Sequence, residues 1–467
     1  MSSLDPGKLT SVDEHGDRLY IIPAEVRGFF RRHRDWTQIV LLIIFLLIPW
    51  TTINGHQTIL INIPDREFAL FGVLFRAHDV PLLFFILGAL TLGLAFVTSI
   101  WGRVWCGWAC PQTVFIDAVY RRIEQWVEGS YIKRRQLRDG PMTSEKAAKK
   151  TLKWILFTIV SSLIAHSFIA YFVGAKELVE MTQHAPSENF TYFSLVLVFT
   201  ALILFDFAWF REQFCVIMCP YGRIQSVLLD QKSLAVVYDV TRGEPRRGAA
   251  KDGEKTGDCV ACNRCVQVCP TGIDIRNGLQ MECIACTSCV DACDEIMEKV
   301  KKPKGLIRYD TLDGSPISLL KPRSLLYMGA IFALLGGLTY SVATRSPAHL
   351  TVLRGAGLPY SYVKNVQNTD LILNQFRLHI QNQSEIPALY QLSLPAELLA
   401  QGVEFSVAEN PLNLNAGESR EWYFFVRVPP TLFIPSGQIK TQLTVKDLKE
   451  NSSFETQREL ILVGPKE

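Results

Sequence analysis

Cysteine is absent from the last 120 or so residues of this chain, although twelve cysteines occur before them. This distribution argues against a disulfide framework and favours cysteines that bind metal. A strong net charge is also absent, because 48 basic and 45 acidic residues leave a formal charge of +3, and we expect no nucleic-acid partner. At 467 residues, the chain is long enough for two or three domains.

Long apolar runs are present, and five of them approach the ~20 residues that cross a bilayer. We expect a polar N-terminal segment over residues 1–35 and a five-helix transmembrane bundle over 36–215 and 325–343. The predicted spans are 36–53, 80–100, 152–174, 192–210 and 325–343.

Basic residues cluster just before the first span and again between the second and third spans, over residues 121–150. The positive-inside rule then places the N-terminus and residues 211–324 in the cytoplasm, and the tail after residue 344 in the periplasm, of a bacterial inner membrane. All twelve cysteines would lie on the reducing side. Because no small-residue cleavage site follows the first span, we expect a signal anchor and not a cleaved signal peptide.

Eight of the cysteines form two runs of identical spacing, C-x2-C-x2-C-x3-C, between residues 259 and 293. This spacing is the known ligand pattern of bacterial ferredoxins, in which the fourth cysteine of each run binds the other cluster. We therefore predict two [4Fe–4S] clusters in a cytoplasmic α+β ferredoxin-like domain over 216–324, with each fourth cysteine at the start of a following helix. The alternative, a pair of zinc sites, would favour two C-x2-C knuckles with a longer spacer. The predicted ligands are Cys259, Cys262, Cys265 and Cys293 for one cluster, and Cys283, Cys286, Cys289 and Cys269 for the other.

The other four cysteines occur in two copies of a C-x3-C-P motif, each at the end of a predicted span. Spacing of i, i+4 puts both sulfurs of a copy on one helical face, and the proline suits the first position of a new helix. The second thiol would then lie near a helix N-terminus, which lowers a thiol pKa. Soft thiolates favour Cu(I), zinc or iron–sulfur centres, and we interpret Cys106, Cys110, Cys215 and Cys219 as copper-handling residues close to the ferredoxin segment. The alternative is that they are small packing residues at helix ends. After Cys110, the pattern PQTVFIDAVYRRIEQW predicts an amphipathic interfacial helix.

His166 is a lone imidazole inside the third predicted span. It is a candidate ligand of haem or copper, or a proton donor to a quinone, but hydrogen bonding between helices is an equally common role. Arg103 and Arg211 stand beside the two motifs, where we expect them to contact lipid headgroups more than to tune the thiolates.

Alternating polar and apolar residues dominate the tail, for example over 371–380, 421–428 and 440–445. Asn, Gly and Pro separate these runs at intervals typical of a β-sandwich. We expect an all-β, immunoglobulin-like domain over 345–467 without the usual disulfide. No catalytic group of residues is visible in it.

The chain resembles the cytochrome c oxidase accessory protein family (CcoG, FixG and RdxA type) in RRHRDWTQIV, WCGWACPQTVFID, CVIMCPYGRIQS and CPTGIDIRNGLQMECIACTSC, and in its cysteine-free β tail. The resemblance implies reduction of Cu(II) to Cu(I) for the copper centre of a haem–copper oxidase. It also implies that the C-x3-C-P thiols handle copper and that the eight clustered cysteines supply electrons. Respiratory polyferredoxins share the C-x3-C-P and ferredoxin arrangement.

Two other functions stay open. One is a quinol-linked electron conduit without copper chemistry, and the other is a non-catalytic assembly scaffold or copper carrier. Expected partners are the lipid bilayer, oxidase subunits or their copper chaperones, and an unidentified electron donor. A homodimer also stays open.

Overall fold

The structure is a computed structural model that describes residues 20–64, 67–75, 79–248, 256–318, 321–364, 369–384, 386–449 and 454–466. The chain divides into two compact units, one up to Thr339 and one from Tyr340 onward. The first unit contains both the membrane helices and the ferredoxin segment, and the domain boundary at residue 216 stays a prediction. Residues 20–28 belong to the same unit, since the Ala24 N–H donates to the Gln267 carbonyl at 2.8 Å.

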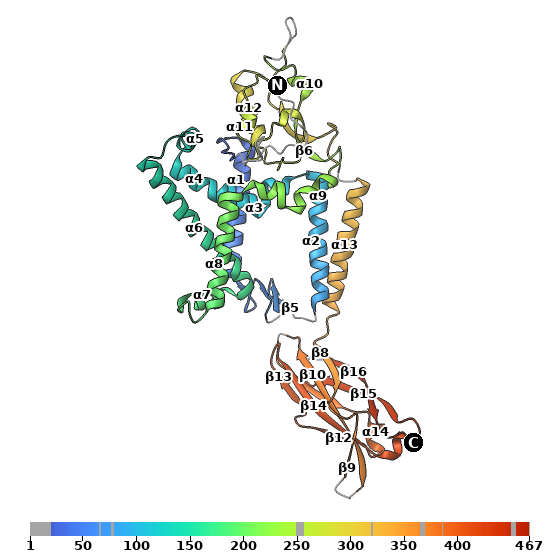
Figure 1. The fold of residues 1–467 in the computed structure, drawn as a ribbon. Helices are drawn as coiled ribbons and strands as arrows, with labels where there is room; N and C mark the ends of the chain where they lie inside the picture. Colours follow the sequence, from blue (N-terminus) through green and yellow to red (C-terminus); the bar gives the residue numbers. More distant parts are fainter. Residues whose placement is uncertain are drawn as a thin grey trace. The chain divides into compact units, whose positions relative to one another are not determined.

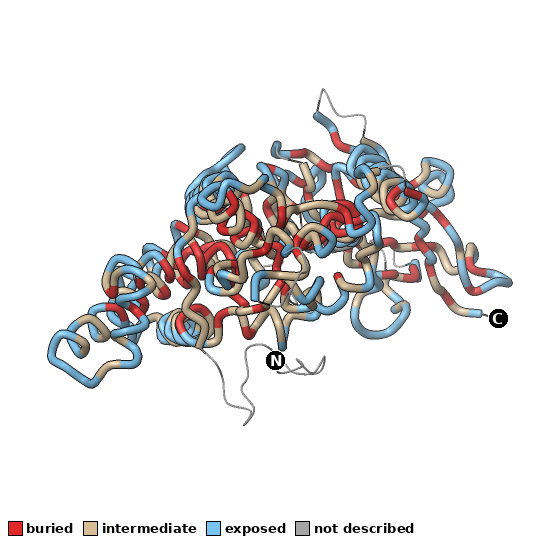
Figure 2. The backbone as a smooth tube through the Cα atoms, turned by 90° about the horizontal axis from the view of Figure 1, so that it is seen from above, coloured by how far each residue is buried: buried red, intermediate tan, exposed pale blue. Residues whose placement is uncertain are grey.

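Four helices in the described residues are long and apolar enough to cross a membrane, and they match the second to fifth predicted spans. Within the apolar window of each of these helices, at most 39% of the residues are buried inside the protein. Figure 2 colours the backbone by burial, with exposed residues in pale blue. These helices are α2 (Val80–Trp101), α6 (Ser144–Val173), α8 (Phe190–Leu204, continued by the π turn η5, Phe205–Phe210) and α13 (Pro322–Ala343).

The first predicted span, 36–53, differs from the helix that forms there. Helix α1 begins earlier, at Phe29, and ends at Leu47, before the short helix η1 (Ile48–Trp50). Helix α1 has 19 residues, but its first turns carry Arg31, Arg32 and Arg34, so it is not among the helices apolar enough for a span, and a fifth span stays a prediction. The Tyr171 hydroxyl of α6 nevertheless donates to the Phe45 carbonyl at 2.7 Å, so α1 runs beside α6 to its far end.

The helices form two groups in Figure 1. Helices α1, α6 and α8 pack through aromatic side chains, with the rings of Phe168 and Phe199 5.4 Å apart. Helices α2 and α13 pack through glycine, because a Cβ on Gly337 would lie 2.7 Å from the Phe85 ring. Small residues permit such close approach between helices in lipid, where apolar burial alone gives no preference for protein over lipid.

Shorter elements join the helices. At one end lie β1 (Thr52–Ile53), β2 (His56–Gln57), β3 (Ile59–Asn62), β4 (Glu67–Leu70), β5 (Val73–Phe75) and α7 (Ala175–Gln183). At the other end lie η3 (Trp105–Ala109), α3 (Pro111–Phe115), η4 (Ile116–Tyr120), α4 (Arg121–Glu128), α5 (Tyr131–Asp139), η6 (Phe214–Met218) and α9 (Pro220–Leu228).

The ferredoxin segment lies at this second end (Figure 1). Strands β6 (Leu234–Tyr238) and β7 (Ile307–Thr311) pair antiparallel and flank the cysteine runs. Its helices are α10 (Val240–Gly243), α11 (Arg264–Gln267), η7 (Ile275–Asn277) and α12 (Ser288–Lys299). The Asp291 carboxylate of α12 accepts the backbone N–H groups of Phe30 and Arg31 at 3.2 and 2.7 Å, so the ferredoxin segment caps the N-terminus of α1.

The second unit is a sandwich of two antiparallel sheets, ordered β12-β14-β10-β8, with β9 also pairing β10, and β13-β11-β15-β16. Both inner faces contribute to one core that includes Phe376, Trp422 and Leu443. The three predicted strands lie within β10, β14 and β15, which confirms the immunoglobulin-like prediction in outline. The elements are β8 (Ala348–Arg354), β9 (Ser361–Lys364), β10 (Asp370–Asn382), β11 (Ala388–Ser393), α14 (Ala396–Ala400), β12 (Glu404–Val407), β13 (Leu412–Leu414), β14 (Ser419–Val428), η8 (Pro430–Phe433), β15 (Gln438–Asp447) and β16 (Glu455–Val463).

Glycine packing between α2 and α13 can be tested by comparing two glycines of α13. Gly337→Leu forces a side chain against Phe85, whereas Gly329→Leu enters space with no atom within 4 Å. We expect Gly337→Leu to be less stable than Gly329→Leu by about 1–3 kcal/mol, the usual cost of overpacking. Thermal unfolding in detergent, followed by circular dichroism, measures the difference. Equal stability of the two variants would contradict this packing.

Candidate thiol site and cluster loops

The two C-x3-C-P motifs adopt the same backbone path 109 residues apart. A residue with positive φ ends each membrane helix, Gly102 at φ 60° and ψ −135° and Arg211 at φ 51° and ψ −129°. A π turn follows in both copies, closed by N–H groups of Cys110 and Cys219 that donate at 2.8 Å to carbonyls five residues earlier. Each proline then opens a helix. The two motif copies thus share one backbone path. The predicted placement of both sulfurs on a regular α-helical face is wrong, because Cys106 and Cys215 lie in π turns, whereas Cys110 and Cys219 follow these turns in extended conformation.

The four thiols of the two copies line one cavity of about 40 Å³. A third wall comes from the ferredoxin segment, through Met281, Glu282 and Ile284. The Cys106 thiol lies 3.4 Å from the carboxamide oxygen of Gln225, its acceptor, in α9. Sequence reasoning missed Gln225 and the third wall, because nothing in the spacing of the cysteines indicates either.

Burial dominates the acidity of these thiols. It raises the pKa of Cys106 to about 12 and raises the pKa of Cys110 as well, although the N–H groups of Gln112 and Thr113 act in the opposite direction. The predicted lowering of the pKa of Cys110 by a helix N-terminus is therefore wrong, because desolvation outweighs two backbone hydrogen bonds. A metal cation bound here must displace the thiol protons.

The eight clustered cysteines divide between two cavities of about 20 Å³ each. The members of the two groups are Cys259, Cys262, Cys265 and Cys293 around one cavity, and Cys269, Cys283, Cys286 and Cys289, with an edge of Cys265, around the other. These groups coincide with the predicted ligand sets, and all eight thiols are free of disulfides, as iron–sulfur ligation requires.

Both cluster loops have the same unusual backbone. Ala261 and Asn263 in the first loop, and Ala285 and Thr287 in the second, have φ between 52° and 59°. Side chains rarely adopt this conformation, and its repetition at matching positions indicates a functional requirement. The fourth cysteines do not start helices as expected. Helix α11 ends before Cys269, while Cys293 lies inside α12, which continues past Asp294 where the first run has Pro270.

Two contacts join the second cluster loop to the thiol cavity. The Arg103 guanidinium donates to the carbonyls of Met281 and Cys283, the latter at 3.1 Å. Gly107 packs so closely that an added Cβ would lie 2.5 Å from the Ile284 carbonyl oxygen. The equivalent residue of the second copy is Val216. The second cluster loop therefore contacts the first copy of the C-x3-C-P motif at Gly107. A glycine between the two cysteines of only one copy is a sequence signal that could have indicated this contact.

Helices α3, η4 and α4 form the predicted amphipathic segment, but its polar face is buried. Asp117 accepts from Arg31 and Arg34 at 2.8 and 3.0 Å, and Glu124 from Arg211 at 2.7 Å. Arg211 is only 2% exposed and Arg103 only 6%, so the prediction that these arginines contact lipid headgroups is wrong. Both instead bind the protein's own acceptors beside the thiol motifs.

His166 lies in α6, where its Nδ1 hydrogen-bonds the Ser162 carbonyl of the previous turn at 2.7 Å. Across the described residues, no three His, Cys, Asp or Glu side chains meet closely enough to hold a single metal ion. His166 thus has no set of metal-ligating neighbours there.

The cluster cysteines are consistent with this finding, because each thiolate of a [4Fe–4S] cube binds a different iron. The four C-x3-C-P thiols share a cavity without three of them meeting at one point.

Two ferredoxin-type cysteine loops joined to apolar helices define a membrane iron–sulfur electron-transfer protein. Three segments match known families, described as a 4Fe-4S binding domain (residues 82–130), a 4Fe-4S dicluster domain (210–312) and an IG-like fold at the C-terminal of FixG (338–465). Protein RdxB of Cereibacter sphaeroides is 33% identical over 419 residues, which cover 83% of this chain and 86% of RdxB. The chain belongs to the FixG, RdxA and RdxB family of polyferredoxins.

Two further relatives match over 307 residues, or 63% of this chain. Protein RdxA of Cereibacter sphaeroides is 40% identical, and nitrogen fixation protein FixG of Rhizobium meliloti is 38% identical. The matched part is less than two thirds of either relative, 63% of RdxA and 58% of FixG. The crystal structure of a FixG-related protein from Vibrio parahaemolyticus matches 26% of this chain and 98% of its own, with 16% identity and a TM-score of 0.21.

Substitution of Gly107 tests the contact between the thiol cavity and the cluster loop. Gly107→Ala should displace Ile284 and Ala285, destabilise the protein by about 1–3 kcal/mol and alter the electron paramagnetic resonance spectrum of the reduced protein. Val216→Ala, at the equivalent position of the second copy, is the control. If the spectrum of Gly107→Ala matched that of wild type, the second cluster loop would not pack against Gly107.

Substitution of Glu124 tests the buried ion pair behind the second motif. Burial alone would raise the pKa of Glu124, but the ion pairs with Arg211 and Lys153 hold it at about 2. Glu124→Gln leaves Arg211 buried without its partner charge, and we expect a loss of about 3–5 kcal/mol at neutral pH.

The pH dependence of this loss has a definite sign. Because the folded-state pKa of Glu124 is depressed, its stabilisation is complete above the unfolded pKa of about 4.3 and disappears as pH falls toward about 2. The gap in melting temperature between wild type and Glu124→Gln should therefore narrow below about pH 4. The exposed Glu188→Gln control should lie near wild type throughout, and a gap independent of pH would contradict the assignment.

Proposed function

We propose that this protein reduces Cu(II) to Cu(I) with electrons from two [4Fe–4S] clusters. The observation that carries the proposal is the single cavity lined by Cys106, Cys110, Cys215 and Cys219, whose third wall belongs to the loop region of Cys283. Soft thiolates prefer Cu(I) to harder ions, so a site of this chemistry favours the reduced product.

The proposed cluster ligands are the two groups of four cysteines that surround separate cavities. When bound, the clusters supply single electrons. Cys262 is the exposed member of the first group, so that group would receive electrons from a donor. The second group, beside Met281 and Ile284, would be adjacent to the thiols.

The chain's own residues would position copper as the substrate. Arg103 and Gly107 hold the second cluster loop against the cavity, which keeps the distance for electron transfer short. Gln225 orients the Cys106 thiol through their hydrogen bond. Cu(II) takes one electron, becomes Cu(I) and stays bound by thiolates that have released their protons.

A second candidate for the same thiols is a third [4Fe–4S] cluster. The match of residues 82–130 to a 4Fe-4S binding domain favours it, although that segment contains only two cysteines. Four thiolates from two repeats would supply a complete ligand set. Iron content separates the candidates, since two clusters require about eight iron atoms per chain and three about twelve.

The proposed setting is assembly of the copper centre of a haem–copper oxidase, with the ferredoxin segment in the cytoplasm and the C-terminal domain in the periplasm. Family membership and the basic residues before and between the helices support it. Oxidase subunits or their copper chaperones would then receive Cu(I).

Cysteine substitution tests the copper proposal directly. The protein is reduced anaerobically and the excess reductant is removed. Addition of Cu(II) should then oxidise the clusters, and a chelator should trap an equivalent amount of Cu(I). Cys106→Ser/Cys110→Ser and Cys215→Ser/Cys219→Ser should each slow Cu(I) formation by more than about tenfold. Because both pairs form one site, the fourfold variant should be little slower than either double variant.

Three controls make the outcome decisive. Met218→Ala alters an exposed residue between two of the thiols and should keep wild-type activity. Iron content should be the same in wild type and the fourfold variant, whereas loss of a third of the iron would favour the third cluster. Wild-type clusters that stay reduced after Cu(II) is added would contradict copper reduction and leave a quinol-linked conduit or a scaffold.

A further inference from the structure

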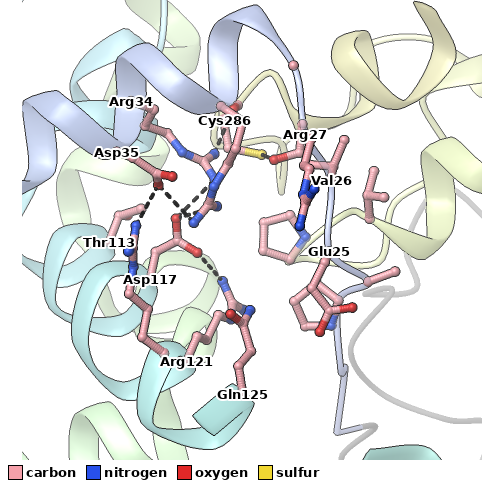
Figure 3. A pocket seen from close by; sticks show the side chains of 18 of the residues that line it. Glu25, Val26, Arg27, Arg34, Asp35, Thr113, Asp117, Arg121, Gln125 and Cys286 are labelled. Atoms are coloured by element: carbon pink, nitrogen blue, oxygen red, sulfur yellow. Dashed lines mark hydrogen bonds and ion pairs between the residues drawn. The ribbon is translucent and has the colours of Figure 1, made fainter. Parts of the chain in front are cut away.

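A pocket of about 470 Å³ lies beside the second cluster loop and outside the thiol cavity. The N-terminal segment before α1, the first turns of α1, the α3–η4–α4 segment and residues 268–288 surround it. Figure 3 shows Glu25, Val26 and Arg27 on one wall, with Arg34, Asp117 and Arg121 opposite them. Its volume is within the usual range for small-molecule sites.

The pocket carries a large excess of positive charge. Seven arginines and three carboxylates line it, and Glu212 outside the lining pairs with Arg121, which leaves three positive charges without a balancing acid. The carboxylates are already engaged. Asp117 binds Arg31 and Arg34, Asp35 binds Arg31 and Arg122, and Glu25 binds Arg134. The side chains of Arg27 and Arg32 make no hydrogen bond or ion pair with the described part of the chain.

Hydrogen-bond donors inside this pocket wall also lack acceptors. Arg34, Arg121 and Arg134 are at most 5% exposed, and the Nε of each is buried without a partner among the described residues. Buried donors of this kind cost free energy unless an acceptor is supplied. These Nε atoms are enclosed by the protein, so a ligand in the pocket would contact other guanidinium nitrogens. The charge excess and the unpaired side chains of Arg27 and Arg32 indicate that such a ligand is an anion.

We propose that this pocket binds the phosphoryl group of an anionic ligand, either a soluble phosphate ester or the headgroup of a phospholipid. Arginine forks match phosphate oxygens in pairs, and a polyvalent group suits an excess of three charges better than a monovalent ion does. The pocket is also far larger than a halide. Since Cys286 lines it and its carbonyl accepts from Arg34 at 2.6 Å, the bound group lies beside the second cluster loop.

Arg27 and Arg32 provide the test, because both line the pocket, are exposed and lack partners whose loss would unfold the protein. Arg27→Gln and Arg32→Gln should each weaken binding by about tenfold, since each removes a charged hydrogen bond to phosphate. Arg458→Gln, which alters an exposed arginine in the C-terminal domain, is the charge-matched control and should bind like wild type.

Isothermal titration of the full-length protein in neutral detergent uses four probes: inorganic phosphate, glycerol 3-phosphate, phosphatidylglycerol in mixed micelles, and phosphatidylcholine in the same micelles. Binding of the first two, weakened in both pocket variants, supports a soluble phosphate ester. Binding of phosphatidylglycerol alone, weakened in the same way, supports a lipid headgroup. No binding by wild type, equal binding of phosphatidylcholine and phosphatidylglycerol without binding of the soluble probes, or pocket variants that match Arg458→Gln would overturn the proposal.

Discussion

Buried ion pairs at one end of the helices fix how α1 and the turn after α8 pack against the α3–η4–α4 segment. Asp117 and Glu124 lie on the same face of the α3–η4–α4 segment, and their arginine partners come from α1 and from the turn after α8. Ion pairs out of water recover their desolvation cost only with close geometry and several hydrogen bonds. Removal of one partner of such a pair leaves a buried charge uncompensated and destabilises the fold. The pairs therefore specify how these segments pack together.

The Glu124–Arg211 pair also explains an exception in the internal repeat. Gly102 takes its positive φ at little cost and permits close approach to the Leu234 carbonyl, whereas Arg211 adopts the same path with a side chain. Two hydrogen bonds to Glu124 and one to the Ala208 carbonyl hold Arg211 there. Burial of its charge thus stabilises a backbone conformation that a side chain disfavours, and the second C-x3-C-P turn then matches the first.

Arginines at this end of the helices also contact the thiol motif and the second cluster loop. Arg34 joins α1, Asp117 and the Cys286 carbonyl, and Arg103 joins the first thiol motif to the loop of Cys283. Positive charge beside the second cluster loop favours the reduced, more negative state of a cluster bound there. The proposed anion site and the proposed electron path therefore meet at one loop, and occupancy of one would act electrostatically on the other.

The sequence by itself determined the cysteine chemistry, four of the spans, the repeat and the β tail. Each depends on local spacing or on composition along one segment: the ferredoxin runs, apolar stretches long enough to cross lipid, and alternation in residues such as 421–428. Only the tertiary structure decided that four thiols share one cavity, that Gly107 seats a cluster loop, that burial keeps Cys106 protonated, and that Arg103 and Arg211 are internal. Those properties depend on desolvation and on contacts between residues more than 100 positions apart, such as Cys106 and Gln225, and no pattern within either segment contains them.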